Sequence, residues 1–110
     1  MRIISIKVLR DYWILHPETK SHLESWKNEV EFSNWKNSSD IKEKYQNASI
    51  LKSRRVVFNI KGNDFRLVVS IAFKIGIIYV KFIGTHKEYD KIDANTVELE
   101  IKNGNKTNQK

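Results

Sequence analysis

The spacing of hydrophobic residues changes near residue 50, from the period of a helix to the alternation of a strand. Before that point, the pattern predicts a short apolar strand at residues 1–6 and a helix over residues 7–15. Pro17 suits the first turn of a second helix, whose apolar side chains fall on one stripe: Leu23, Trp26 and Val30. Asp40, in the pattern Asp-x-x-Glu, predicts the capped start of a third, short helix that ends near Tyr45.

Beyond residue 50, three segments alternate apolar and polar residues, which predicts a three-stranded antiparallel meander. The segments cover residues 54–60, 65–74 and 77–83. They are connected by Gly62-Asn63 and Ile75-Gly76, and glycine at these places is typical of hairpin turns.

The predicted pairing sorts the side chains of the meander onto two faces. The expected pairs are Phe58–Leu67, Asn59–Arg66 and Ile60–Phe65, then Val69–Phe82, Ser70–Lys81, Ile71–Val80 and Phe73–Ile78. One face is apolar: Val56, Phe58, Ile60, Phe65, Leu67, Val69, Ile71, Phe73, Ile78, Val80 and Phe82. The other face is polar and basic: Arg55, Asn59, Lys61, Arg66, Ser70, Lys74, Tyr79 and Lys81. The expected fold is therefore α+β, with N-terminal helices packed on one face of an antiparallel β-sheet.

A capping box follows the last predicted strand. Thr85 and Glu88 have the Thr-x-x-Glu spacing, which predicts a short helix from Thr85 to about Ile92. We expect one domain over residues 1–93, because 110 residues are too few for two independent cores. Residues 94–110 are expected to form a partly disordered tail, since residues 103–110 contain no apolar side chain.

Positive charge is concentrated in one stretch of the chain. The formal net charge is +7, and residues 51–87 hold eight basic residues against one acidic residue. Residues 1–50 contribute +1 and residues 88–110 contribute −1. A localised positive field favours a polyanionic partner, with nucleic acid first. The alternative is a lysine-rich sheet edge that deters aggregation.

Other classes of protein are excluded or disfavoured by composition. The absence of cysteine excludes disulfides and thiolate metal sites, and His16 and His22 lack the spacing of metal ligands, so we assign no metal and no cofactor. No apolar run is long enough to span a membrane, and no secretory signal is recognisable. We therefore expect a cytoplasmic protein.

Candidate chemistry gathers beside the end of the third predicted strand. His86 and Tyr89 are three residues apart on the last helix, while the pairing places Arg66 between Thr85 and Asn59. RNA cleavage by the 2′-hydroxyl needs a base, stabilisation of charge on the phosphate and an acid for the 5′-oxygen, which these side chains could supply. Each also has a structural interpretation: His86 as a surface or capping residue, Tyr89 as a packing residue, and Arg66 as part of an ion pair.

Two segments resemble the HigB family of toxins from bacterial toxin–antitoxin pairs. They are residues 57–69 (VFNIKGNDFRLVV) and residues 79–92 (YVKFIGTHKEYDKI), within a similarity that spans about residues 1–93. The resemblance implies a RelE-like fold and metal-independent endoribonuclease activity that cleaves mRNA on the ribosome and inhibits translation. It also implies restraint by a HigA-like antitoxin with a helix-turn-helix domain.

Within this resemblance, we expect Arg66 to stabilise the charge of the transition state and His86 with Tyr89 to transfer protons. The residues expected to hold RNA are Arg54, Arg55, Asn59, Lys61, Asn63, Lys81 and Lys87. Two other functions stay open. A RelE-like domain can instead inhibit a protein target, as the ParE-type gyrase toxins do, and a non-catalytic RNA-binding module would present the same basic face.

Overall fold

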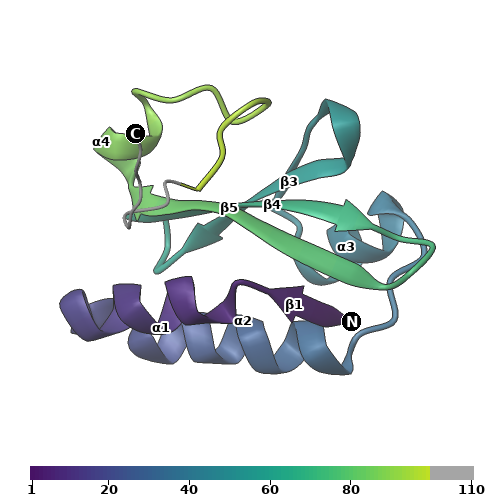
Figure 1. Ribbon diagram of the computed structural model, residues 1–110, viewed down its shortest axis with the longest axis horizontal. Helices are drawn as coiled ribbons and strands as arrows, with labels where there is room; N and C mark the ends of the chain where they lie inside the picture. The colour runs from purple at the N-terminus through teal and green to yellow at the C-terminus, as the bar shows by residue number, and fades with distance from the viewer. Residues whose placement is uncertain (100–110) are drawn as a thin grey trace, which may run out of the picture.

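A five-stranded sheet with helices on both sides forms the described part of the protein, residues 1–99 of the computed structural model (Figure 1). The elements are β1 (Arg2–Ile4), α1 (Ile6–Leu15), a 3₁₀ turn (Pro17–Thr19), α2 (Lys20–Phe32), α3 (Ser38–Lys44), β2 (Ser49–Ile50), a second 3₁₀ turn (Lys52–Arg54), β3 (Arg55–Ile60), β4 (Phe65–Ala72), β5 (Ile77–Thr85) and α4 (His86–Tyr89). The strand order is β1-β5-β4-β3-β2. The predicted α+β class is confirmed, but the sheet is mixed rather than wholly antiparallel, because β1 pairs parallel with β5.

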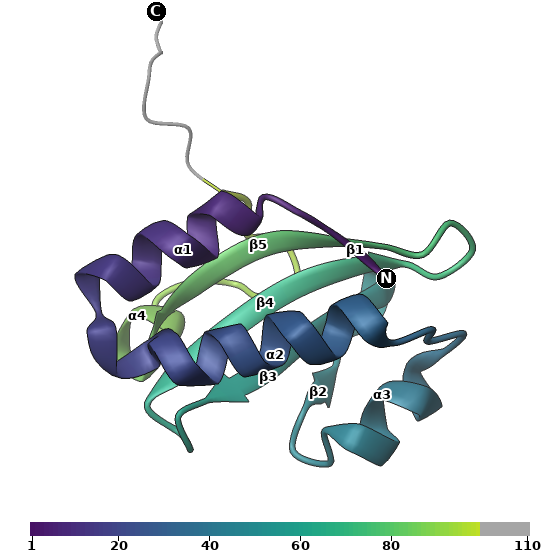
Figure 2. The same cartoon turned by 90° about the horizontal axis from the view of Figure 1, so that it is seen from below.

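The main core lies between the sheet and the helices α1 and α2, which cover one face side by side (Figure 2). The predicted stripe of α2 is confirmed, since Leu23, Trp26 and Val30 are all buried. The Trp26 ring meets Phe58 of β3 edge-on, with ring centroids 5.4 Å apart. Each such side chain contributes about 2–3 kcal/mol by leaving water, so this layer fixes the position of the sheet.

The start of α3 differs from the sequence prediction. Asn37 is the N-cap, and its side-chain oxygen accepts a hydrogen bond from the Asp40 amide at 3.1 Å. The Asp40 carboxylate accepts instead from the backbone amide of Lys36 at 2.8 Å. Asn and Asp cap helices equally well, so the sequence offered two starts and the earlier one is used.

The register of the first hairpin is confirmed, with Ile60 opposite Phe65 and Asn59 opposite Arg66. The register of the second hairpin is wrong by two residues, because Ile78 lies opposite Ile71 rather than Phe73. Gly76, with φ of +68°, closes a longer turn in which its amide donates to the Phe73 carbonyl at 3.3 Å. A shift of two residues leaves each side chain on its predicted face.

A β-bulge in β5 then reverses the faces for the rest of that strand. Val80 lies opposite Val69, but Phe82 lies opposite Val68, so Lys81 is the extra residue. Phe82 therefore leaves the predicted core face, and Ile83 packs against the main core in its place. The expected pairing of Thr85 with Arg66 is also wrong, because Gly84 takes that position.

The face of the sheet opposite α1 and α2, here called the outer face, is not uniformly polar as expected. It carries a second apolar cluster in which Val57, Val68 and Ala94 are buried against Leu51, Phe82, Tyr89, Ile92 and Val97. Residues 93–99, here called the outer strap, supply part of this cluster, and Leu99 packs against the main core. Packing thus continues beyond the domain boundary predicted at residue 93.

The remainder of the predicted tail, residues 100–110, lies outside the described residues. Among residues 1–99, no helix has the length and apolar character that crossing a bilayer requires.

The contact between Tyr45 and Glu29 of α2 predicts how the free energy of unfolding changes at acidic pH. The Tyr45 hydroxyl donates to Glu29, and Lys44 Nζ lies 3.0 Å from the same carboxylate. These two partners, Tyr45 first, lower the pKa of Glu29 below its ordinary value of 4.5. A carboxyl group whose pKa is lower in the folded than in the unfolded protein stabilises the fold at any pH above the unfolded pKa. This stabilisation is lost as the pH falls through the pKa of the folded protein.

Tyr45→Phe is therefore expected to reduce the free energy of unfolding at pH 7 by about 1 kcal/mol, since a charge-assisted hydrogen bond is lost from a partly solvated site. The difference from wild type should narrow as the pH falls below 4.5, where Glu29 takes up a proton. Urea unfolding at pH 7 and at lower pH measures both effects. Tyr79→Phe is the control, because the Tyr79 hydroxyl makes no hydrogen bond within residues 1–99. A difference that is constant with pH would contradict the role of Glu29.

Candidate functional site

Arg66 lies on the outer face of β4, between Asn59 of β3 and Gly84 of β5. Its guanidinium turns toward the β3–β4 loop, where Nη1 donates to the Asn63 carbonyl at 2.8 Å and to the Phe65 carbonyl at 3.3 Å. Arg66 is on the face that the sequence predicts to be polar, but it is only 9% exposed. These bonds fix one edge of the guanidinium and leave its other donors for an anion.

The short helix α4 is fixed to the same loop. Thr85 and Glu88 form the predicted capping box, with the Thr85 amide donating to Glu88 at 2.8 Å and the Glu88 amide donating to the Thr85 hydroxyl at 3.1 Å. The His86 amide donates to the Asp64 carbonyl at 2.9 Å. The cap is confirmed, although the helix ends at Tyr89 rather than near Ile92.

Gly84 gives the capping box its space. A Cβ atom at this position would lie 2.6 Å from Phe82 Cζ and 2.8 Å from the Glu88 side-chain oxygen. Both distances are shorter than a non-bonded contact allows, so a larger residue would displace the Glu88 carboxylate or the Phe82 ring. The Glu88 carboxylate and the Phe82 ring thus use the space that a glycine leaves at the end of β5.

The structure brings Arg66, His86 and Tyr89 to one corner of the outer face, as the sequence predicts. Arg66 Cζ lies 5.7 Å from the centre of the Tyr89 ring, a cation–π distance. The same loop binds both residues: the backbone amide of His86 donates to the Asp64 carbonyl, and the Arg66 guanidinium donates to the Asn63 carbonyl. The His86 side chain is 47% exposed, so its imidazole is open to a ligand.

His86 has an acidic partner to which the sequence analysis gave no role. Its Nδ1 atom lies 3.1 Å from a carboxylate oxygen of Asp90, four residues further along. A carboxylate at one ring nitrogen fixes the tautomer and orientation of an imidazole, which leaves Nε2 for proton transfer. The i, i+4 spacing of His86 and Asp90 was the available signal in the sequence.

The underside of this corner is packed by α1. The Tyr12 ring stacks on His16 at 4.3 Å and meets Phe65 edge-on at 6.1 Å, directly next to Arg66 in β4. Burial raises the pKa of Tyr12 to about 12, with the carboxylates of Glu88 and Glu18 adding to the shift. Tyr12 therefore stays a neutral packing residue below the site.

The predicted RNA-binding residues fall into separate groups. Asn59 and Lys61 line a cleft of about 380 Å³ between α2 and the first hairpin, together with Ser21, His22 and Ser25. Asn63 is exposed in the loop next to them, and Lys87 is exposed beside His86 on α4. Of these four residues, Asn59 is opposite Arg66 in the sheet, and Asn63 offers its carbonyl to Arg66.

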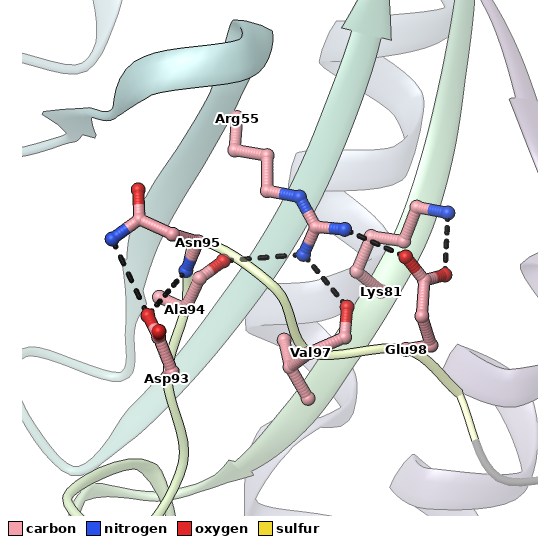
Figure 3. A network of polar contacts seen from close by, with 7 residues as sticks. All are labelled: Arg55, Lys81, Asp93, Ala94, Asn95, Val97 and Glu98. Carbon is pink, nitrogen blue, oxygen red and sulfur yellow. Dashed lines mark hydrogen bonds and ion pairs between the residues drawn. The ribbon is translucent and has the colours of Figure 1, made fainter.

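The other three predicted RNA-binding residues lie further along the sheet. Arg54 is exposed in the turn before β3, away from the corner. Arg55 is 7% exposed and, with Lys81, contacts Glu98 of the outer strap (Figure 3). The sequence analysis missed Glu98, since 43 residues separate it from Arg55 and no local pattern connects them. Within residues 1–99, no three His, Cys, Asp or Glu side chains gather as metal ligands.

Comparison with known proteins agrees with this architecture. Residues 19–92 match the HigB toxin family, described as the RelE-like toxic component of a toxin–antitoxin system. The mRNA interferase toxin HigB of Escherichia coli K12 is 29% identical over 96 residues, covering 86% of this chain and 92% of that protein. The mRNA interferase HigB of Shigella flexneri has the same identity and coverage. The family match covers more than half of the chain, and the chain therefore belongs to the HigB family of RelE-like toxins, whose partners are antitoxins.

Proposed function

We propose that this toxin is an endoribonuclease that cleaves mRNA, with Arg66, His86 and Tyr89 as its reacting side chains. The observation that carries the proposal is the corner where Arg66 Cζ lies 5.7 Å from the centre of the Tyr89 ring, with the exposed imidazole of His86 on the same short helix as Tyr89. The names of the relatives, mRNA interferases at 29% identity, support the same reaction.

The chemistry follows from the acid–base character of the three groups. His86 Nε2 takes the proton of a ribose 2′-hydroxyl as its oxygen attacks the adjacent phosphorus atom. Arg66 donates to the phosphate oxygens, where negative charge grows in the transition state. Tyr89 gives its proton to the 5′-oxygen as the P–O5′ bond breaks. The products are a 2′,3′-cyclic phosphate and a 5′-hydroxyl, so the reaction requires no metal ion.

RNA would approach the corner along the exposed polar residues around it. The β3–β4 loop contains Lys61 and Asn63 and follows Asn59 of β3, while Lys87 comes directly after His86 on α4. We expect these four side chains to hold the phosphates and bases next to the scissile bond. Arg54 would bind the RNA further along its path. We propose that Arg55 and Lys81 also serve RNA, although both contact Glu98 in this structure.

The setting of the reaction is part of the proposal. Cleavage of translated messages places the substrate on the ribosome, inhibits translation and puts the toxin in the cytoplasm. The antitoxin partner is proposed to carry a helix-turn-helix domain of the HigA type.

Replacing Arg66 tests the core of the proposal. Arg66→Ala should relieve the growth arrest that wild-type toxin causes without antitoxin, but it also removes a charged donor from the buried Phe65 carbonyl and the part-buried Asn63 carbonyl, at a cost of about 1–3 kcal/mol. Arg66→Lys keeps the charge and loses the forked geometry, so it should fold and still lose most cleavage. Growth, the melting temperature and the mapped 5′ ends of transcripts are measured after brief induction.

Lys74→Gln is the matched control, since it removes one exposed positive charge in the β4–β5 loop. Folded Arg66→Lys protein that cleaves at the wild-type rate would exclude Arg66 from the mechanism. Growth arrest by wild-type toxin with no new transcript ends would contradict the nuclease function itself and favour an inhibitor that acts by binding alone.

Replacing His86 tests the assignment of the base. His86→Gln should lower the cleavage rate by roughly 10²–10⁴ while RNA affinity changes little, because proton transfer is lost and the side chain keeps its size and polarity. Asp90→Asn should give a smaller loss, since the imidazole remains but its partner is neutral. Rates at saturating RNA and affinities for a 2′-O-methyl oligonucleotide separate the two effects.

Lys74→Gln, at an exposed residue in the β4–β5 loop, is again the control. If His86→Gln weakens RNA binding as much as it slows cleavage, His86 contacts phosphate as a cation. If it cleaves at the full rate, another group is the base.

A further inference from the structure

An acidic side chain occupies the basic part of the outer face. Glu98 of the outer strap places one carboxylate oxygen 2.7 Å from Arg55 Nη2 on β3 and the other 2.7 Å from Lys81 Nζ on β5 (Figure 3). The strap reaches this position from beyond α4, on the side of the sheet away from α1 and α2 (Figure 1). Two cations from different strands thus meet the two oxygens of one anion.

Arg55 is held in place independently of Glu98. Its Nη1 atom donates to the carbonyls of Ala94 at 3.1 Å and Val97 at 2.7 Å. The arginine is therefore oriented by the backbone of the strap, while its Nη2 atom points to the carboxylate. Removing the Glu98 side chain alone would leave the Arg55 guanidinium held at this position.

The exposed fractions of Arg55, Lys81 and Glu98 show which of these side chains can move away from the other two. The Arg55 side chain alone is 8% exposed and that of Lys81 is 23% exposed, whereas the Glu98 side chain is 62% exposed. Ala94 and Val97 pack against the outer cluster and keep the strap on the sheet without the carboxylate. An ion pair of such an exposed acid contributes little to stability. Lys81 and Arg55 also lower the pKa of Glu98, so the carboxylate is ionised at neutral pH and competes with other anions.

The anion site lies on the same face as the proposed active site. Arg55 and Asn59 are four residues apart on β3, which corresponds to about 13 Å along the strand, and Asn59 is opposite Arg66. An anion at Arg55 and Lys81 is thus within reach of an RNA chain whose scissile phosphate lies at Arg66. The paired donors suit the two non-bridging oxygens of a phosphodiester.

We propose that Arg55 and Lys81 form a second phosphate-binding site for the RNA substrate and that Glu98 fills this site until RNA displaces its side chain. The inference rests on the proposed nuclease function and adds a competitor for the substrate, built into the toxin itself. It accounts for a buried arginine and a half-buried lysine that share one solvent-exposed acid.

Glu98→Gln tests the competition, because it removes the charge and keeps the size of the side chain. Binding of a 2′-O-methyl oligonucleotide is measured over a range of salt concentrations, so that no cleavage occurs. The variant should bind about fivefold more tightly than wild type, and its salt dependence should steepen by about one released counterion. Glu43→Gln, an exposed glutamate on α3, controls for the loss of one negative charge elsewhere.

Lys81→Gln is the second test of the proposed phosphate site. It should weaken binding and flatten the salt dependence, and in the double variant the gain from Glu98→Gln should largely disappear, because both changes act on one site. Melting temperatures show whether the strap is retained. If Glu98→Gln matches Glu43→Gln in affinity and salt dependence, or lowers the melting temperature without changing binding, Glu98 is a structural anchor and the inference fails.

The same measurements separate this inference from the proposed function. Wild-type toxin that binds and cleaves RNA while Glu98→Gln has no effect leaves the nuclease function standing and overturns the second site alone. Folded wild-type toxin that binds no RNA, with or without Glu98→Gln, overturns both.

Discussion

The single extra residue in β5 determines what the outer face of the sheet carries. Without the bulge at Lys81, Phe82 would continue the alternation of Ile78 and Val80 into the main core, and Val57 and Val68 on the other side of the sheet would lose its cover. With the bulge, Phe82 turns outward and supports Val68 and Tyr89. Bulges bend a strand and redirect its side chains, and here the redirected end of β5 becomes the base on which α4 is built.

That reversal explains how two proposed sites come to lie on one face of a small sheet. It places Gly84 opposite Arg66, and the missing side chain gives Glu88 the space to complete the cap of α4. It also creates an apolar patch that the outer strap can cover, which brings Glu98 to Arg55 and Lys81. The proposed active site and the proposed second phosphate site therefore share one structural cause.

Most of the fold could be predicted from local patterns, and the exceptions have physical reasons. The first hairpin and the Thr85–Glu88 cap were predictable because turn and capping residues act over a few positions. The bulge was not, since Lys81-Phe82-Ile83 fits either face and no glycine or polar gap marks the break. Glu98 was not predictable either, because its contact with Arg55 joins residues far apart in sequence. The position of the corner of Arg66, His86 and Tyr89 was predictable despite the register errors. At Arg66 the net error is one residue, because Gly84 rather than Thr85 of β5 lies opposite it, and α4 still begins beside Arg66.

Net charge and burial affect different steps of the proposed RNA binding: net charge affects the attraction at a distance, and burial affects the strength of each contact. Of the eight basic residues in 51–87, Lys52, Arg54, Lys74 and Lys87 are exposed and contribute to the long-range field that attracts a polyanion. Arg55, Arg66 and Lys81 are held against carbonyls or Glu98 and are largely withdrawn from solvent. Coulombic interactions strengthen as water is excluded, so these three attract an anion most strongly at contact. A sequence with the same total charge but without the strap and the β3–β4 loop would attract RNA equally well and would lack the oriented guanidinium groups that the proposed chemistry requires.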